Sequence, residues 1–415
     1  MLYTVFIYLV YLIAYLAYPF SRKVRNRLKG LSGNINRIRN KRRNDTAPLV
    51  WIHCASLGEF EQGKPLLEAF LKQRPEYKSL VTFFSPSGFI PSQNYSKTDI
   101  IAYIPWDTPF SAKRFLAAAN PSVVFWIKYD YWKNHLIQIK KRNIPCYLVS
   151  ATFRPDQYFF KPALKWLNPV KYFTRLFVQT EQSKQLLATV GINNVTVTGD
   201  TRFDRVRKVA SKNVSFPVVE RFIQSSQKTL IAGSSWQKDE IIIAEALRQF
   251  PDIKLILVPH EINPERIELS EQIFSFCRTL RYTQAGQTNP EEANVLIVDT
   301  IGILSSIYRY ADAAYIGCGF DNGIHNTLEA AVYGIPVAFG PKYDKFEEAK
   351  ELIAAGGATS INNADELRSL LTLWFNDDNH ERERQGKICA NYVERNSGIT
   401  EKILAEIILI RTGNK

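Results

Sequence analysis

Short runs of apolar residues alternate with longer mixed stretches along most of the chain. The runs are rich in β-branched and aromatic residues, which is typical of buried strands. Their alternation with helical stretches predicts βαβ units and parallel sheets. The expected strands are Leu49–Cys54, Leu80–Phe84, Ile100–Ile104, Val123–Ile127, Cys146–Val149, Leu176–Val178 and Val195–Thr198, followed by a second series, Thr229–Ala232, Leu255–Val258, Val295–Val298, Ala313–Ile316 and Val337–Phe339.

A polar stretch separates the two series of strands. Residues 204–227 carry Lys, Ser, Asn and Pro in place of apolar runs, which indicates an irregular linker. We therefore predict two Rossmann-like α/β domains whose parallel sheets face an interdomain cleft, since such sheets bind ligands beyond the carboxyl ends of their strands. The predicted boundaries are an N-terminal helix over 1–20, a basic segment over 21–46, a first domain over 47–210, a linker over 211–227, a second domain over 228–395 and a C-terminal helix over 396–415.

The N-terminus combines an uncharged segment with a dense group of cations. The uncharged segment, Leu2 to Phe20, is about 28 Å long as a helix, close to the thickness of a bilayer core. If the helix spans a membrane, the cations after it place the rest of the chain in the cytoplasm. Four tyrosines share one helix face, which favours a helix lying in the membrane surface instead. Both arrangements stay open, and either attaches the chain to membrane lipids through residues 1–43. The tyrosines are Tyr8, Tyr11, Tyr15 and Tyr18, and the cations are Arg22, Lys23, Arg25, Arg27, Lys29, Arg37, Arg39, Lys41, Arg42 and Arg43.

Charge and cysteine content disfavour several classes of function. The N-terminal cations account for most of the formal net charge of +13, so the basic character belongs to one segment and not to a nucleic-acid-binding face. The five cysteines form no C-x-x-C pair. That pattern disfavours a disulfide framework or a zinc site and is typical of a reducing compartment. A secretory signal peptide is also disfavoured, because no positive n-region precedes the apolar segment.

A glycine-rich turn in the second domain has the pattern of a phosphate site. Residues 317–331 follow the run Ala313–Ile316, and Asn326 opens a helical stretch expected over Thr327 to Tyr333. Strand, glycine loop and helix N-terminus together present free N–H groups to an anion. Glu329 lies one turn in, where its carboxylate could accept hydrogen bonds from ribose hydroxyls. The spacing G-x-G-x-x-x-G is one residue longer than the dinucleotide fingerprint, which favours a nucleotide other than NAD. The alternative is a tight turn without a ligand.

The first domain offers one carboxylate at the equivalent edge of its sheet. Glu59 follows the run Leu49–Cys54 at the start of a predicted helix, so it faces the predicted cleft. A carboxylate can act as general base toward a hydroxyl. The helix N-terminus lowers its pKa whereas desolvation raises it, and the sequence leaves open which effect is larger. From position alone, an acid that only stabilises the helix start is the better interpretation. His53, at the end of the same strand, is interpreted as a core residue.

Other strand ends of the second domain also carry polar residues. Ser234 and Ser235 could cap the helix that follows them, or hold phosphate through N–H and hydroxyl groups. Pro259 ends another strand because it lacks an N–H, and His260 beside it could contact a nucleotide. Gly302 permits close backbone approach in a third loop. Together these positions predict a binding rim.

Five segments, taken together, resemble the motifs of the Kdo (3-deoxy-D-manno-octulosonic acid) transferase family, which builds the inner core of lipopolysaccharide. Residues 51–59 resemble its W-I-H-x-x-S-x-G-E segment, and residues 197–204 resemble its V-T-G-N-x-K-x-D segment. Residues 233–236, 258–261 and 323–331 match its donor-site motifs in order.

The resemblance implies a membrane-associated GT-B glycosyltransferase at the cytoplasmic face of an inner membrane. Such an enzyme transfers Kdo from CMP-Kdo to a lipid A precursor, lipid IVA, with inversion and without a bound metal or other cofactor. The resemblance makes Glu59 the general base, against the interpretation from position alone. The implied donor-binding residues are Ser234, Ser235, Pro259, His260, Ile301, Gly302, Ile303, Gly323, His325, Asn326, Thr327, Leu328 and Glu329, and the implied acceptor-binding residues are Ser56, Gly58, Lys128, Asp130 and Arg154.

One segment departs from the family pattern. Where the family often has E-T-E-L-W-P-N, the chain places Lys128 at the first acid and Asp130 at the second, so Lys128 is expected to contact an anion. The aromatic and basic stretch 153–161 is interpreted either as a packed surface loop or as an apolar, cationic lip for an amphipathic acceptor. Three other functions stay open: a GT-B transferase that uses a UDP-sugar with another lipid or glycan acceptor, an NAD-linked oxidoreductase, and a non-catalytic scaffold at the membrane surface.

Overall fold

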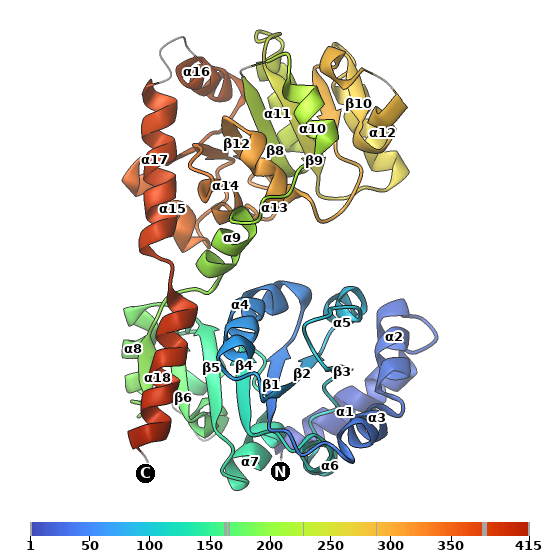
Figure 1. Ribbon diagram of the computed structural model, residues 1–415, viewed down its shortest axis with the longest axis vertical. Coiled ribbons are helices and arrows are strands. Elements are labelled where there is room, and N and C mark those ends of the chain that lie inside the picture. Colours follow the sequence, from blue (N-terminus) through green and yellow to red (C-terminus); the bar gives the residue numbers. More distant parts are fainter. Residues whose placement is uncertain are drawn as a thin grey trace. The chain divides into compact units, whose positions relative to one another are not determined.

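A computed structural model describes residues 2–161, 164, 167–226, 228–287, 289–375 and 380–413. The chain divides into two compact units (Figure 1). Unit 1 comprises residues 1–205 together with 398–415, and unit 2 comprises residues 206–397. Each unit contains a parallel sheet with helices on its faces, as the alternation of strands and helices predicts.

In its described part, unit 1 has a seven-stranded parallel sheet with the order β3-β2-β1-β4-β5-β6-β7. The chain order reverses between the central strands β1 and β4, whose residues 50–53 and 123–126 are paired. Every residue of β1 and β4 is buried, because helices cover both faces of the sheet. All seven strands match apolar runs expected from the sequence. The strands are β1 (Leu49–Cys54), β2 (Lys78–Phe83), β3 (Ile100–Tyr103), β4 (Val123–Ile127), β5 (Cys146–Ala151), β6 (Arg175–Val178) and β7 (Val195–Val197).

The helices of unit 1 follow the strands in sequence, and the C-terminal helix returns to this unit. α18 (Ile399–Gly413) begins where the Asp204 carboxylate accepts hydrogen bonds from the backbone N–H groups of Gly398 and Thr400, at 2.7 and 2.6 Å. Its Glu406 accepts a hydrogen bond from Arg175 of β6. The other helices that cover this sheet are α4 (Leu57–Gln73), α5 (Pro86–Ser92), α6 (Pro109–Ala119), α7 (Lys133–Lys141) and α8 (Glu181–Ala188).

In the described part of unit 2, a second seven-stranded parallel sheet has the order β10-β11-β9-β8-β12-β13-β14. Its chain order reverses between β8 and β12. The structure contains two short edge strands, β10 and β14, that the sequence analysis did not predict. The strands are β8 (Thr229–Ser235), β9 (Lys254–Pro259), β10 (Thr279–Arg281), β11 (Val295–Ile297), β12 (Ala313–Ile316), β13 (Val337–Phe339) and β14 (Ala358–Ser360), and the longer helices are α11 (Gln237–Leu247), α12 (Pro264–Ile273), α15 (Glu347–Ala355), α16 (Ala364–Trp374) and α17 (His380–Arg395).

The polar stretch interpreted as an irregular linker contains two helices. α9 spans Arg202–Ala210 and α10 spans Pro217–Ile223. Pro217 stands at the first helical position, where its missing N–H costs nothing. Val219 and Phe222 are fully buried, so α10 packs as part of unit 2. The expectation of irregular structure was wrong here, because two apolar residues on one helix face are enough to bury a short helix.

Three helices precede the first strand: α1 (Leu2–Leu16), α2 (Arg22–Leu31) and α3 (Asn34–Arg42). One side of α1 packs against unit 1, where the Tyr3 hydroxyl donates to Asp107 at 2.6 Å and the Tyr11 ring lies 5.0 Å from Trp106. Large apolar side chains on its other side are between 50% and 72% exposed. Among the residues that the structure describes, no helix combines the length and the apolar character needed to cross a membrane.

The N-terminal cations are not all on the surface. Arg27 is only 6% exposed and donates to the carbonyl oxygens of Phe84 and Ile104, at the ends of β2 and β3. Its guanidinium lies 3.9 Å from the centre of the Phe84 ring. Arg27 therefore joins α2 to the sheet, whereas the sequence assigns it to the membrane-facing cluster.

Candidate functional site

The predicted site residues of unit 1 follow the two central strands at the point where the chain order reverses. Glu59 lies in the first turn of α4, directly after β1, while Lys128 and Asp130 follow β4. Because β1 and β4 are paired and parallel, their carboxyl ends meet at one edge of the sheet. This is the position at which open α/β sheets bind ligands.

The environment of Glu59 decides the question that its position left open. Its carboxylate accepts a hydrogen bond from the backbone N–H of Ala55. The pKa of Glu59 is raised to about 7, because burial and, to a smaller extent, the nearby Asp130 raise it more than the Ala55 N–H and Lys128 lower it. The effect of desolvation, which raises the pKa, therefore outweighs the effect of the helix N-terminus, which lowers it. A carboxylate with this pKa is a competent base near neutral pH.

Two charged side chains of opposite sign stand beside Glu59. Burial raises the pKa of Asp130 to about 6, although Arg27 lowers it. Lys128 has a left-handed backbone with φ of 60°, and its charge lowers the pKa of both Glu59 and Asp200. Lys128 is thus a cation shared between carboxylates, in a loop whose backbone conformation is unusual for a residue with a side chain.

The other predicted acceptor residues occupy different surroundings. Ser56 is the N-cap of α4, but its side chain makes no cap hydrogen bond. A Cβ atom added at Gly58 would meet nothing within 4 Å, so packing does not require glycine there. Arg154 is exposed and lies 3.5 Å from Asp156. In its loop, Phe153 and Phe159 are buried, with 3% and 1% exposed. These two rings favour the interpretation of a packed loop over that of an apolar lip.

Unit 2 has a small cavity at its own reversal point, between the ends of β8 and β12. Its volume is about 130 Å³, so it can hold only part of a nucleotide. Four predicted donor residues line it together with four that the sequence analysis did not assign to the donor. The lining residues are Gly233, Ser234, Leu304, Tyr308, Ile316, His325, Asn326 and Glu329.

Glycine is required at two positions around this cavity. A Cβ atom at Gly233 would overlap the hydroxyl of the fully buried Tyr308. A Cβ atom at Gly317 would overlap the backbone of Ser234 and lie 2.6 Å from the Cα atom of Ser235. Gly233 therefore leaves room for the Tyr308 ring, and Gly317 lets the ends of β8 and β12 approach each other closely.

Three aromatic rings stack at the edge of the donor cavity. Trp236 lies 5.2 Å from His260, and His260 lies 4.5 Å from His325, with interplanar angles of 24° and 20°. Burial and the neighbouring His260 lower the pKa of His325 to about 4. His325 is therefore neutral at pH 7. Its Nε2 atom is buried without a hydrogen-bond partner among the described residues, so it is available to a ligand.

The helix after the glycine loop is shorter than expected. α14 spans Leu328–Ala331 only, and turns replace the rest of the predicted stretch. Asn326 donates to Glu329 at 3.2 Å and accepts from the N–H of Leu328 at 3.2 Å. Thr327 and Leu328 are fully buried and do not line the cavity. Gly323 has a left-handed φ of 113° in the same loop.

The remaining predicted donor residues lie at neighbouring strand ends. Ile301 is 82% exposed and Gly302 has φ of 93°, in the loop after β11. Ile303 precedes α13 (Leu304–Ile307), whose first residue lines the cavity. Pro259 is the last residue of β9, and the N–H of His260 donates to Ser235 at 3.0 Å.

The predicted capping role of Ser234 and Ser235 is wrong. The N-cap of α11 is Trp236, whose backbone N–H donates to the Asp239 carboxylate at 2.9 Å. The Ser235 hydroxyl instead donates to the buried Glu240 at 2.7 Å. Ser234 adopts a left-handed φ of 55°, which places it in the turn between strand and helix.

Asp239 is a positioning residue that the sequence analysis missed. Besides Trp236, its fully buried carboxylate accepts from the Cys318 N–H at 2.8 Å and from the Tyr315 hydroxyl at 2.9 Å. It therefore ties the end of β8 to the glycine loop after β12. An acid at the third position of a helix is the local signal for a capping interaction, but nothing local indicates the contact with Cys318.

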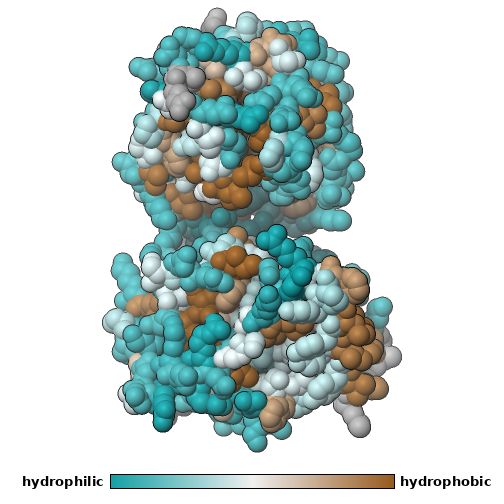
Figure 2. Space-filling view, turned by 90° about the vertical axis from the view of Figure 1, so that its right-hand side faces the viewer, coloured by the Kyte–Doolittle hydropathy of each residue, from teal (hydrophilic) through white to brown (hydrophobic). Residues whose placement is uncertain are grey.

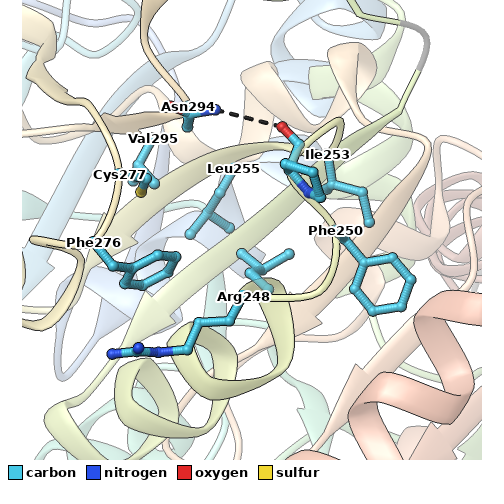
Figure 3. Close-up of a pocket in the computed structure, with 10 residues that line it drawn as sticks. Arg248, Phe250, Ile253, Leu255, Phe276, Cys277, Asn294 and Val295 are labelled. Carbon is cyan, nitrogen blue, oxygen red and sulfur yellow. Dashed lines mark hydrogen bonds between the residues drawn. The ribbon is translucent and has the colours of Figure 1, made fainter.

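A second cavity in unit 2 lies at the opposite ends of the strands. Figure 3 shows its lining, which includes Leu255 at the start of β9 and Val295 at the start of β11, with the Phe250 and Phe276 rings. Its volume is about 270 Å³. Asn294 closes part of it by donating to Pro251 at 3.4 Å. Despite its size, this cavity holds none of the predicted site residues.

The described residues also contain no group of three or more His, Cys, Asp or Glu side chains that could hold a metal ion. The expectation of a reaction without a cofactor stays a prediction.

Comparisons with known proteins agree with one another. Residues 25–205 match the family model for 3-deoxy-D-manno-octulosonic-acid transferase (kdotransferase). The chain is 30% identical over 335 residues to the 3-deoxy-D-manno-octulosonic acid transferase of Aquifex aeolicus, covering 78% of this chain and 85% of that protein. It is 29% identical over 387 residues to the Rickettsia bellii enzyme of the same name, covering 90% and 89%.

Solved structures with the same architecture support the fold. UDP-GlcNAc 2-epimerase from Neisseria meningitidis has a TM-score of 0.63 at 17% identity, over 87% of this chain and 99% of that one. MurG from Acinetobacter baumannii has a TM-score of 0.52 at 14% identity, over 87% and 99%. At these identities the likeness shows a GT-B-like α/β fold and nothing about substrates.

Proposed function

This chain belongs to the 3-deoxy-D-manno-octulosonic-acid (Kdo) transferase family and is a glycosyltransferase that transfers Kdo; from that premise we propose its substrates, its mechanism and its location. The donor is CMP-Kdo and the acceptor is a lipid A precursor, lipid IVA. Transfer inverts the anomeric carbon and needs no metal. The observation that carries the proposal is the position of the Glu59 carboxylate in the first turn of α4, at the carboxyl end of β1 where the chain order of the sheet reverses, and burial there raises its pKa to about 7.

Glu59 accepts the proton of the attacking acceptor hydroxyl. A base is most effective when its pKa lies near the working pH, and burial of Glu59 provides that value. The deprotonated oxygen attacks the anomeric carbon of Kdo from the side opposite the CMP leaving group, and this direction of attack inverts the configuration. Lys128 keeps part of the Glu59 population ionised, because its charge lowers the pKa of that carboxyl.

The cavity between β8 and β12 holds part of the CMP group of the donor. Neutral His325 offers an unpaired ring nitrogen, and Asn326 with Glu329 forms a polar pair on the cavity wall. Glu329 accepts hydrogen bonds from the ribose. His260 and Asn326 stabilise the charge that develops on the departing phosphate. Transfer requires the bound donor and the acceptor hydroxyl beside Glu59 to meet in the ternary complex.

Unit 1 binds the acceptor and attaches the protein to the cytoplasmic face of the inner membrane. The exposed side of α1 carries Leu9, Leu12 and Ile13, which are 53%, 57% and 55% exposed. Cations of α2 and α3 follow in sequence. An apolar face beside cations is typical of a helix that lies in a membrane surface with anionic lipids. Figure 2 shows a band of apolar residues along one edge of the unit drawn at the bottom.

A transfer assay tests this proposal. The purified protein is incubated with CMP-Kdo and lipid IVA in detergent micelles, and the lipid products are analysed by mass spectrometry. We expect acceptor molecules that carry added Kdo, with CMP released in equal amount. Calorimetry should show saturable binding of CMP that is stronger than that of UMP or UDP. Transfer from a UDP-sugar, with no product from CMP-Kdo, would contradict the proposal and favour the alternative donor.

A further inference from the structure

A mostly apolar groove in unit 1 lies between the N-terminal helices and the ends of two strands. Its walls come from α1, α2, the loop after β2 and Trp106 after β3, and its volume is about 220 Å³. This is smaller than a pocket that encloses a whole small-molecule ligand, but it is enough for part of a narrow chain. The apolar wall is formed by Ala14, Val24, Leu28, Phe84, Pro86 and Trp106.

One wall of the groove is hydrogen-bonded to the residues that hold the proposed base. The N–H of Ser85, which lines the groove, donates to the carbonyl oxygen of Ala55 at 2.8 Å. The N–H of Ala55 in turn donates to the Glu59 carboxylate. The neighbouring Phe84 stacks on Trp132 at 4.8 Å, two residues beyond Asp130. The groove therefore adjoins the residues that surround Glu59.

The rim of the groove has the properties of a surface that meets an anionic lipid. Lys23 lines the groove and is exposed, and no acidic residue interrupts the segment from Arg22 to Arg43. Phe20, just before α2, is 89% exposed. A lipid that carries negative charge close to its chains matches both the apolar wall and the positive rim.

We propose that this groove holds one acyl chain of the lipid acceptor and thereby positions the acceptor hydroxyl beside Glu59. The inference rests on the proposed function, because it assumes a lipid acceptor. An acyl chain fits the groove better than a peptide does, since a peptide would bury backbone polar groups against an apolar wall. The occupant is the acceptor and not a bulk membrane lipid, because the groove adjoins the reaction site.

Photo-crosslinking tests the location of the chain. An acceptor that carries a diazirine within an acyl chain is irradiated on the full-length protein, and labelled peptides are identified by mass spectrometry. We expect label on residues 23–28 and 84–86, competed by unlabelled acceptor. Labelling confined to other segments would overturn the proposal. So would equal labelling by a phospholipid probe that the acceptor does not displace, or crosslinks between two protein copies through these residues.

A groove-filling variant tests the consequence for catalysis. Val24→Trp is expected to lower the ratio of kcat/KM for the acylated acceptor to kcat/KM for its deacylated analogue by at least tenfold. The reason is that each methylene excluded from the groove costs roughly fourfold in affinity. Ile241→Trp, at an exposed position of α11, is the matched control and should leave the ratio unchanged. An unchanged ratio in Val24→Trp would refute the acyl-chain site, whereas absence of transfer to either acceptor by the wild type would refute the proposed function. If Val24→Trp fails to fold, the crosslinking map still decides.

Discussion

The pKa of Glu59 has a consequence for stability that can be measured without any substrate. Burial raises this pKa from 4.5 to about 7 in the folded protein. A carboxyl group whose folded pKa is raised binds more protons in the folded state than in the unfolded state between these two values. Folding is therefore not penalised below about pH 4.5, and the penalty grows as the pH rises and is complete above about pH 7.

The size of the penalty follows from the shift. At 1.36 kcal/mol per pKa unit, the charged Glu59 costs about 3 kcal/mol of folding free energy above pH 7. Glu59→Gln removes this cost, because the amide is uncharged while its oxygen still accepts the Ala55 N–H. We expect the variant to gain up to about 3 kcal/mol of stability relative to wild type at pH 8.5, and far less at pH 5.

Urea unfolding at pH 5 and pH 8.5, followed by tryptophan fluorescence, measures the difference. Trp51 and Trp126 are buried in the core of unit 1 and report on the unit that contains Glu59. Glu61→Gln serves as the matched control, since Glu61 lies on the same helix as Glu59 and pairs with Lys64 of that helix and with Arg205 of α9. If Glu59→Gln were less stable than wild type at pH 8.5, or if its effect were the same at both pH values, the assignment of a raised pKa would be refuted.

Three further results are expected. Gly233→Ala should weaken CMP binding at least tenfold in calorimetry, because its Cβ atom would displace the Tyr308 ring from the cavity wall, whereas Gly286→Ala, with open space around it, should bind CMP normally; equal affinities would refute the cavity as the CMP site. Asp130→Asn should move the acidic limb of the pH–rate profile to lower pH, because the Asp130 charge raises the pKa of Glu59; a shift to higher pH would contradict this. Leu12→Glu should reduce sedimentation with anionic vesicles, since Leu12 is 57% exposed on the apolar side of α1, and unchanged binding would remove α1 from the membrane contact.

The strands were the most predictable part of this molecule. A strand buried on both faces needs a continuous apolar run. Leu49–Cys54 and Val123–Ile127 are such runs, and burial on both faces is the environment that suits them best. β10, Thr279–Arg281, was not predicted because its three residues are all partly exposed and form no such run. α10 was not predicted because only two of its residues, Val219 and Phe222, form a buried face, and they lie in a stretch interpreted as polar.

The site was predictable in location but not in chemistry. The sequence places Glu59 and the glycine loop at strand ends, and the sheet order puts these ends at the points where the chain order reverses, which is where open α/β sheets bind ligands. The pKa of Glu59 depends on burial by distant segments, which no local pattern encodes. The same holds for Arg27, which looks like a surface cation but bonds to two strand ends, and for Asp239, whose contact with Cys318 joins residues far apart in the chain.

The role of Glu59 as general base is tested most directly by the single-turnover rate of Kdo transfer in Glu59→Gln, measured with saturating CMP-Kdo and lipid IVA. The account predicts a rate lower by about 10²–10⁴-fold, the usual contribution of a general base, with CMP affinity unchanged in calorimetry. A rate within about threefold of wild type, in a variant that binds CMP normally, would contradict it.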